Sequence, residues 1–141
     1  MSPVPRQSTC VAINGRAVLL EGPSGIGKSS LALSLIDRGA VLVGDDSVML
    51  DVRKARVFAS PHPRTKGLLE VRNLGLLPFA CTHNVPIALL LMLDPAAPRY
   101  VEAAETTTLR NVPLPAIRLW PGGNAALKVE LALNRYGLPH P

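Results

Sequence analysis

The sequence predicts an α/β fold with a strand-rich mixed sheet, and three observations lead to this prediction. A glycine-rich motif lies between a short apolar stretch and a helical one, which is the strand–loop–helix order of α/β folds. Most of the following chain consists of short apolar runs separated by turn residues. The 14 prolines and 11 glycines among 141 residues favour many turns and few long helices.

Length and composition limit the possible classes of protein. A chain of 141 residues, 48% of them hydrophobic, is expected to form a single globular domain over residues 1–141. The longest apolar run, residues 87–93, is too short to span a membrane, and the N-terminus lacks the apolar segment of a signal peptide. Cys10 and Cys81 have neither metal-binding nor redox spacing, which favours a reducing, cytoplasmic location.

The net charge of +5 does not by itself indicate nucleic-acid binding. The 15 basic residues are spread over the whole chain, and few aromatic residues lie among them. An anionic nucleotide and an acidic or phosphorylated protein partner are the better explanations for this charge.

The first elements form a predicted β-hairpin. Residues 9–13 and 17–20 are apolar strand candidates, and Asn14 and Gly15 between them supply the positive φ angles of a type I′ turn. The second strand leads directly into the glycine-rich motif.

That motif reads G-x-x-x-x-G-K-S, the phosphate-loop pattern. Its glycines let backbone N–H groups turn toward phosphate oxygens, while Lys28 adds a charge for the outer phosphates and the Ser29 hydroxyl can ligate Mg²⁺. A plain glycine-rich turn is the alternative, but the full motif between a strand and a helix disfavours it. The predicted nucleotide-binding residues are Gly22, Pro23, Ser24, Gly25, Ile26, Gly27, Lys28 and Ser29.

The segment after the motif completes a β–loop–α–β unit. Residues 30–38 are helical, and the N-terminus of this helix points its dipole at the phosphates. Gly39 is expected to end the helix as a left-handed cap. Residues 41–43 form the next strand, and a right-handed crossover makes it parallel to the strand at 17–20.

The remaining elements are predicted from shorter patterns. A turn is expected at Arg53 and Lys54, residues 94–108 receive no assignment, and Asn124 is expected to cap a final helix over residues 125–136. The other predicted strands are residues 48–52, 57–59, 68–71, 74–77, 87–93 and 115–119.

Asp45 and Asp46 follow the strand at 41–43, where ligands gather in open α/β sheets. Phosphoryl transfer needs one carboxylate near Mg²⁺ and a second to take the proton of a hydroxyl acceptor. Because adjacent strand residues face opposite ways, both side chains reach the site only if the backbone turns there. A solvated acidic turn is the alternative.

Glu70 and Arg72 share one face of a predicted strand, and Leu69 and Val71 share the other. Taken alone, an exposed pair of opposite charges is the ordinary explanation for this pattern.

Together, three stretches resemble the catalytic domain of the HPr kinase/phosphorylase family. They are the phosphate-loop motif, the sequence L-V-G-D-D ending at Asp46, and G-L-L-E-V-R-N-L-G over residues 67–75. The last is similar to the family signature E-[IV]-R-G-L-G, and residues 121–124 resemble its P-G-R-N segment. The resemblance covers residues 7–136 and corresponds to a short form without the N-terminal domain of longer members.

This resemblance implies a function and a fold. Members are ATP-dependent protein kinases that phosphorylate a serine of HPr, the carrier protein of the sugar phosphotransferase system, and also run phosphorolysis of the phosphoserine. The implied partner is HPr or a paralogous phosphocarrier, with no nucleic acid or membrane. The implied fold is close to the nucleotide-binding core of phosphoenolpyruvate carboxykinases, and the implied assembly is a homo-oligomer, a hexamer.

The resemblance also assigns roles to individual residues. Lys28 binds phosphate, and Asp46 is the proton acceptor in the kinase direction. Arg99 corresponds to the family's catalytic arginine. Glu70 becomes a magnesium ligand beside Ser29, which replaces the interpretation of a surface ion pair, and Asp45 completes the predicted magnesium ligands. The cofactors are therefore ATP and Mg²⁺.

Three departures from the family pattern predict an altered balance of activities. Gln7 occupies the position of a family histidine and cannot become a cation near neutral pH. Asn73 replaces the central glycine of the signature, a mild change because asparagine tolerates left-handed backbone angles. Trp120 and Gly123 replace two arginines in the loop tied to phosphorolysis, so we expect kinase activity to survive better than phosphorylase activity.

Two other functions remain open from the sequence. Gln7, Trp120 and Gly123 leave room for a catalytically weak nucleotide-sensing module that docks a signalling partner. A small-molecule kinase is the third interpretation, and the absence of any lid or acceptor-pocket insertion disfavours it.

Overall fold

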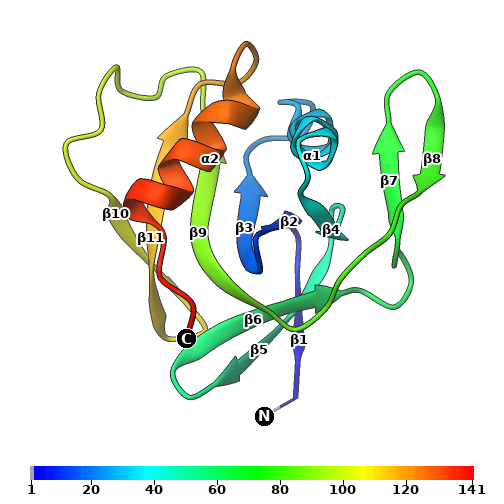
Figure 1. The fold of residues 1–141 in the computed structure, drawn as a ribbon, viewed down its shortest axis with the longest axis horizontal. Helices are drawn as coiled ribbons and strands as arrows, with labels where there is room; N and C mark the ends of the chain where they lie inside the picture. Colours follow the sequence, from blue (N-terminus) through cyan, green and yellow to red (C-terminus); the bar gives the residue numbers. More distant parts are fainter. Residues whose placement is uncertain (1) are drawn as a thin grey trace.

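The computed structural model describes residues 2–141 as a mixed sheet with two helices on one face (Figure 1). Strand-rich α/β architecture is therefore confirmed. The elements in chain order are β1 (Val4–Arg6), β2 (Thr9–Ile13), β3 (Arg16–Glu21), α1 (Lys28–Asp37), β4 (Val41–Gly44), β5 (Val48–Arg53), β6 (Arg56–Pro61), β7 (Leu68–Val71), β8 (Gly75–Pro78), β9 (Val85–Leu93), β10 (Glu105–Leu109), β11 (Val112–Leu119) and α2 (Ala125–Tyr136).

Strand β9 is the centre of the sheet. It pairs in parallel with β3 and β11 and in antiparallel with β6. The order across the main path is β1-β5-β6-β9-β3-β2-β4, and the β10–β11 hairpin joins through β9. Because both faces of β9 are covered, its sequence is an almost continuous apolar run.

The core lies on both faces of the sheet. Along β3, Val18 and Leu20 belong to the cluster under α1 and α2, whereas Ala17 and Leu19 belong to the cluster on the opposite face. This alternation is the two-residue period of a strand whose two faces are both buried. The second cluster is closed by β5 and β6, which curl around that face.

Several local predictions are confirmed. Asn14 and Gly15 have φ angles of 50° and 79°, as the type I′ turn requires. Gly39 follows α1 with a φ of 107°. Its N–H donates to the carbonyl oxygen of Ile36, and the N–H of Ala40 donates to that of Leu35, which caps the last turn of the helix. Strands β3 and β4 run in the same direction, as predicted, although β2 lies between them and pairs with both.

Other boundaries differ from the sequence prediction. Helix α1 begins at Lys28, two residues earlier than expected, because the loop glycines already deliver helical geometry there. The turn after β5 falls on Lys54 and Ala55, both with positive φ, rather than on Arg53. Strand β10 begins inside the segment left unassigned and ends one residue beyond it, and Asn124 makes no side-chain hydrogen bond as a cap.

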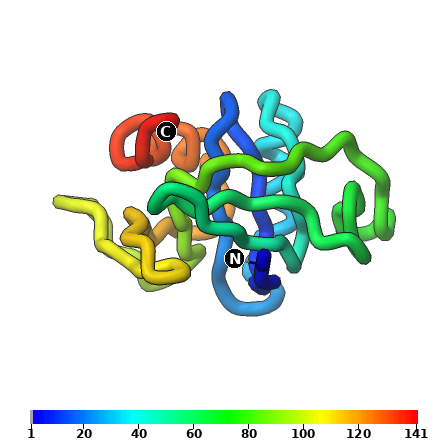
Figure 2. The backbone as a smooth tube through the Cα atoms, turned by 90° about the horizontal axis from the view of Figure 1, so that it is seen from below, coloured from blue at the N-terminus to red at the C-terminus, as the bar shows by residue number. Residues whose placement is uncertain are grey.

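The topology gathers several loops at one edge of the sheet. Glu21 pairs with Met92, and Leu119 pairs with Leu93, so β3, β9 and β11 end side by side. The connections that leave this edge are residues 22–27, 94–104 and 120–124. The β7–β8 hairpin stands outside the main sheet, and the views in Figures 1 and 2 place it at the opposite end of the molecule from residues 100–105. None of the helices within residues 2–141 is both long and apolar enough to cross a membrane.

Candidate functional site

The loop between β3 and α1 has the backbone conformation that its glycines permit. Gly22 has a φ of 147°, and a β-carbon there would lie 2.9 Å from the carbonyl oxygen of Leu93. Gly27, with a φ of 111°, turns the chain into α1. A side chain at Gly22 would push the loop away from the end of β9. The loop therefore packs tightly against the sheet edge and presents the N-terminus of α1 to solvent.

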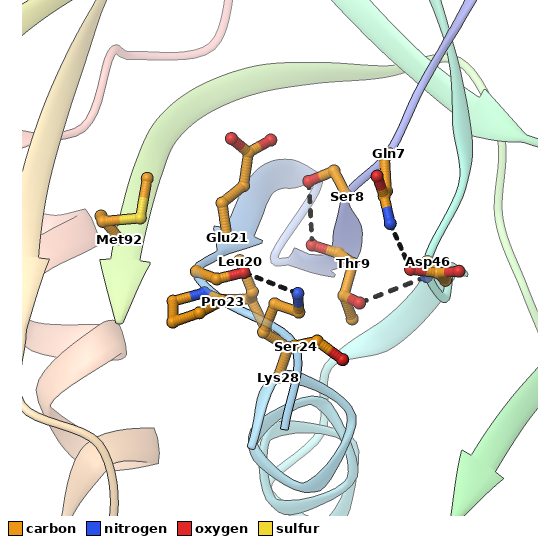
Figure 3. A pocket seen from close by; sticks show the side chains of 11 residues that line it. Gln7, Ser8, Thr9, Leu20, Glu21, Pro23, Ser24, Lys28, Asp46 and Met92 are labelled. Atoms are coloured by element: carbon orange, nitrogen blue, oxygen red, sulfur yellow. Dashed lines mark hydrogen bonds between the residues drawn. The ribbon is translucent and has the colours of Figure 1, made fainter. Parts of the chain in front are cut away.

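Lys28 lies over this loop. Its Nζ donates a hydrogen bond to the carbonyl oxygen of Gly22 at 2.7 Å (Figure 3). The first N–H groups of α1 have no partner within the helix and point out of its N-terminus. The ammonium and these N–H groups together form an electropositive cradle, which is the arrangement that binds phosphate groups in proteins.

Asp45 connects three separate parts of the chain. Its Oδ1 accepts hydrogen bonds from the hydroxyls of Thr9 at 3.0 Å and Ser29 at 2.7 Å. Its Oδ2 accepts a hydrogen bond from the backbone N–H of Glu70 at 3.0 Å. Only 8% of Asp45 is exposed, so these three donors replace the solvation that its carboxylate loses on burial. The alternative interpretation of this acidic pair as a solvated turn does not describe Asp45.

Asp46 follows the buried Asp45 and is exposed to solvent, because the backbone turns at this residue. Its φ of 64° lies in the left-handed region, so the two aspartates do not point in opposite directions as strand residues would. A β-carbon on Gly44 would lie 2.6 Å from the carbonyl oxygen of Ser47, which shows how closely this turn folds back. The N–H of Asp46 donates to the Thr9 hydroxyl at 3.3 Å, and Gln7 donates to its Oδ1 at 3.4 Å (Figure 3).

Glu70 lies on the exposed face of β7, as the two-residue period predicts, and Arg72 is exposed in the turn directly after this strand. Leu69 on the other face is fully buried beneath α1. Both charged side chains line a cavity of about 290 Å³ together with Ser29 and Asp45. No ion pair joins Glu70 to Arg72 among the residues that the structure describes.

A second cavity of about 410 Å³ lies on the other side of Lys28 (Figure 3). Gln7, Glu21 and Met92 are among its lining residues. Four residues line both cavities: Thr9, Ser24, Lys28 and Asp46. The exposed carboxylate of Asp46 and the ammonium of Lys28 therefore lie where the two cavities meet.

Glu21, one of the residues that line the larger cavity, forms an ion pair. Arg6 on β1 donates two hydrogen bonds to Glu21, at 2.7 and 2.8 Å. Glu21 is the last residue of β3, directly before the loop, and its side chain is mostly buried. These hydrogen bonds raise the pKa of the Arg6 guanidinium above its ordinary value.

Comparison with known proteins adds a family to this geometry. A family model of the HPr serine kinase C-terminal domain matches residues 4–85, more than half of the chain.

The chain belongs to this family.

The matched residues contain the loop, both aspartates and Glu70.

Relatives of the HPr serine kinase C-terminal domain family are similar over most of this chain. The HPr kinase/phosphorylase of Limosilactobacillus reuteri is 30% identical over 150 residues, which cover 94% of this chain and 47% of that protein. The HPr kinase/phosphorylase of Clostridium tetani is 33% identical over 140 residues, covering 89% and 46%. The chain thus spans about half the length of these curated relatives, or less.

A solved structure of a family relative has the same fold. The HPr(Ser) kinase/phosphatase from Coxiella burnetii superposes with a TM-score of 0.82 at 25% identity, covering 93% of this chain and 88% of that one. The resemblance to the family is therefore confirmed by sequence and by structure.

Two predicted features of this family member lie apart from the cavities just described. Arg99 lies 5.5 Å above the ring of Tyr100 and lines a separate groove beside α2, so the structure does not bring it to Asp46. Trp120 donates its Nε1 hydrogen to the carbonyl oxygen of Ala97 at 2.7 Å. The lone tryptophan therefore joins the two loops that follow β9 and β11.

Sequence reasoning missed three residues of the site and its surroundings. Thr9 was assigned only to a strand, and Arg6 and Glu21 were not assigned any role. A buried threonine gives no local sequence signal of its partner, because Asp45 lies 36 residues further along the chain. The pairing of β2 with β4, which places Cys10 opposite Gly44, brings the two together.

Proposed function

We propose that this chain is the catalytic part of an ATP- and Mg²⁺-dependent protein-serine kinase that phosphorylates HPr or a paralogous phosphocarrier. The single observation that carries the proposal is the position of Asp45, which holds Ser29 of the loop and the backbone of Glu70 together beside Lys28. Family membership and the names of the relatives support the assignment.

The triphosphate of ATP would lie across the N-terminus of α1. Residues 22–29 would bind it through backbone N–H groups, and Lys28 would exchange the Gly22 carbonyl for phosphate oxygens. The smaller cavity, which these residues line, is the place for the phosphates.

The oxygen atoms around this cavity fit Mg²⁺. The ion usually keeps several waters and binds one or two carboxylates together with substrate phosphates. No cluster of three metal-binding side chains exists in residues 2–141, so the phosphates would have to supply part of the coordination. Ser29 donates its proton to Asp45, which leaves its oxygen lone pairs free, and Glu70 is exposed at the cavity. Asp45 retains one acceptor position on Oδ2, since a carboxylate offers about four. Bound there, Mg²⁺ would neutralise charge on the β- and γ-phosphates.

The acceptor serine would approach from the side of the larger cavity. Asp46 would accept the proton of the serine hydroxyl while the serine oxygen bonds to the γ-phosphorus and ADP leaves. Lys28 would stabilise the negative charge on the transferred group. We assign the same role to Arg99, which requires residues 94–104 to bring it from the groove beside α2 to the cavity.

The remaining features of the proposal concern partners and setting. The net charge of +5 suits an acidic carrier protein as well as ATP. We propose a homo-oligomer, a hexamer by resemblance, and a cytoplasmic location. Phosphorolysis of the phosphoserine is the weaker activity in this proposal, because Gln7, Trp120 and Gly123 lack the cationic side chains expected there.

One experiment separates the kinase from the two alternatives. The purified chain is incubated with Mg²⁺, ATP labelled on the γ-phosphate and HPr, and the label is then followed. Serine-linked label on HPr supports the proposal. Nucleotide binding without transfer would instead support the sensing module. In a parallel incubation with a cell extract in place of HPr, label on a metabolite would support a small-molecule kinase.

A further inference from the structure

Thr9 is the buried residue at the centre of the candidate site. It lies at the start of β2, opposite Leu20 of β3, and only 1% of it is exposed. Its side chain points to the turn after β4 and borders both cavities (Figure 3). A buried hydroxyl must be hydrogen-bonded to offset its lost solvation, so its partners show what it does.

The Thr9 hydroxyl makes two hydrogen bonds with opposite roles. It donates its single proton to Oδ1 of Asp45 at 3.0 Å, and it accepts the backbone N–H of Asp46 at 3.3 Å. Within residues 2–141, no other side chain is hydrogen-bonded to both aspartates. One hydroxyl therefore fixes the carboxylate of the first aspartate and the backbone of the second.

These bonds act on a turn that the backbone alone would not prefer. Asp46 has a φ of 64°, in the left-handed region that non-glycine residues adopt at a cost in free energy unless their surroundings hold them there. The bond from its N–H to Thr9 is such a restraint. The same turn places one carboxylate toward Ser29 and the other toward the larger cavity.

We propose that Thr9 is a positioning residue that holds Asp45 against Ser29 while it holds Asp46 in the orientation for proton transfer. Both hydrogen bonds of its hydroxyl are made to the two aspartates, so it would act through them and not by a bond to substrate or cofactor. This inference rests on the proposed function for its kinetic consequence, but its structural part concerns only the two aspartates and can be tested in the free protein.

The test compares Thr9→Val with Thr9→Ser. Valine has nearly the same shape and removes both hydrogen bonds, whereas serine retains the hydroxyl and loses a methyl group. Thr107→Val, on β10 at the far side of the sheet, is the matched control for exchanging threonine for valine in a strand. Melting temperatures show which variants are folded at the assay temperature.

The first readout is hydrogen exchange of the backbone amides of Asp46 and Glu70 in the free protein. The account predicts that Thr9→Val lowers the protection of both amides by about tenfold, the scale of one lost hydrogen bond, and that Thr9→Ser and Thr107→Val retain it. Unchanged protection of both amides in folded Thr9→Val would overturn the proposal whatever the protein catalyses.

The second readout has two parts, the turnover number for phosphoryl transfer to HPr and the affinity for ATP. The two are compared in each variant. Removal of an outer partner of metal-site residues commonly costs 10- to 100-fold in metal affinity or activity, so Thr9→Val is expected to lower kcat by roughly that factor. The affinity for ATP without Mg²⁺ should change less than about twofold, because the Thr9 hydroxyl is hydrogen-bonded to the two aspartates and not to the phosphate loop. Equal losses in Thr9→Val and Thr9→Ser would also overturn the proposal, since they would implicate packing and not the hydroxyl.

The two readouts distinguish failure of this inference from failure of the proposed function. If wild-type protein transfers no phosphate but Thr9→Val still loses amide protection, the positioning role stands and the kinase assignment fails. If wild-type protein transfers phosphate and Thr9→Val matches it in rate and protection, the kinase assignment stands and the positioning role fails.

Discussion

The Ser29 hydroxyl lies 2.7 Å from Oδ1 of Asp45 and donates its proton to it. This contact joins the first turn of α1 to the turn after β4. The rest of α1 and the whole of β4 separate these two segments in the sequence. A serine that donates its proton keeps the lone pairs of its oxygen available to a cation. The relationship explains why the candidate magnesium position lies at the start of α1.

The first prediction concerns Ser29. Ser29→Ala removes the oxygen that we propose as a Mg²⁺ ligand and leaves Asp45 with one donor fewer, so the Mg²⁺-dependent gain in ATP affinity is expected to fall by about 10- to 100-fold. Calorimetric titration of ATP with and without Mg²⁺ measures this gain. Ser34→Ala, an exposed serine on the same helix, is the control and should behave as wild type. A Ser29→Ala protein with the full magnesium effect would remove Ser29 from the site.

The second prediction concerns the ion pair between Arg6 and Glu21. Glu21 lies directly before the phosphate-loop motif, and Arg6 neutralises its carboxylate. With Arg6→Gln, the free carboxylate would repel the triphosphate, by about 2 kcal/mol for unit charges 8 Å apart at an effective dielectric constant of 20. We expect ATP affinity to fall by about 5- to 30-fold.

The double variant Arg6→Gln/Glu21→Gln separates charge from structure. Removal of both charges should restore most of the ATP affinity, because no unpaired carboxylate remains beside the loop. A double variant as weak as Arg6→Gln alone would show instead that the pair acts by attaching β1 to β3.

The third prediction concerns the two directions of the reaction. Gln7 donates a hydrogen bond to Asp46 but cannot carry a proton near neutral pH, and Gly123 offers no side chain to hold inorganic phosphate. Initial rates with HPr and with phosphoserine-HPr should therefore favour the kinase direction strongly. Robust phosphorolysis at a comparable rate would refute this inference.

The fourth prediction uses the two thiols. Cys10 is fully buried in β2, and burial, together with the nearby Glu21 carboxylate, raises the pKa of its thiol above the ordinary value. A raised pKa keeps the thiol protonated at pH 8, whereas only the thiolate reacts with iodoacetamide. Mass spectrometry of native protein should find label on the half-buried Cys81 and none on Cys10, and both labelled after unfolding. Equal labelling of both thiols in native protein would contradict the burial of β2.

Local patterns predicted much of the fold. The loop glycines, the turn at Asn14 and Gly15 and the apolar run of β9 depend on neighbouring residues only, and the structure has them where the sequence placed them. Glu105–Leu109 contains three threonines in succession and carried a strand signal that was overlooked. Strand β1 has only three residues, one of them a proline, and it forms by pairing with β5 at the sheet edge.

The arrangement of the site was only partly predictable. Asp45, Asp46 and Glu70 were singled out by their positions after or on strands, and the structure brings all three to one cavity with Ser29. The contribution of Thr9 depends on β2 inserting between β3 and β4, a long-range pairing that no local pattern encodes. Arg99 was assigned by resemblance alone, and its place in the groove beside α2 depends on how residues 94–104 pack.

Single-turnover phosphoryl transfer by Asp46→Asn is the most direct test of the central claim that Asp46 takes the proton of a serine on HPr. Asparagine retains the shape and the left-handed backbone but cannot accept that proton. The account predicts that transfer to HPr falls by about 100-fold or more while the affinity for Mg²⁺ and ATP stays near that of wild type. Unchanged transfer by Asp46→Asn would contradict the account.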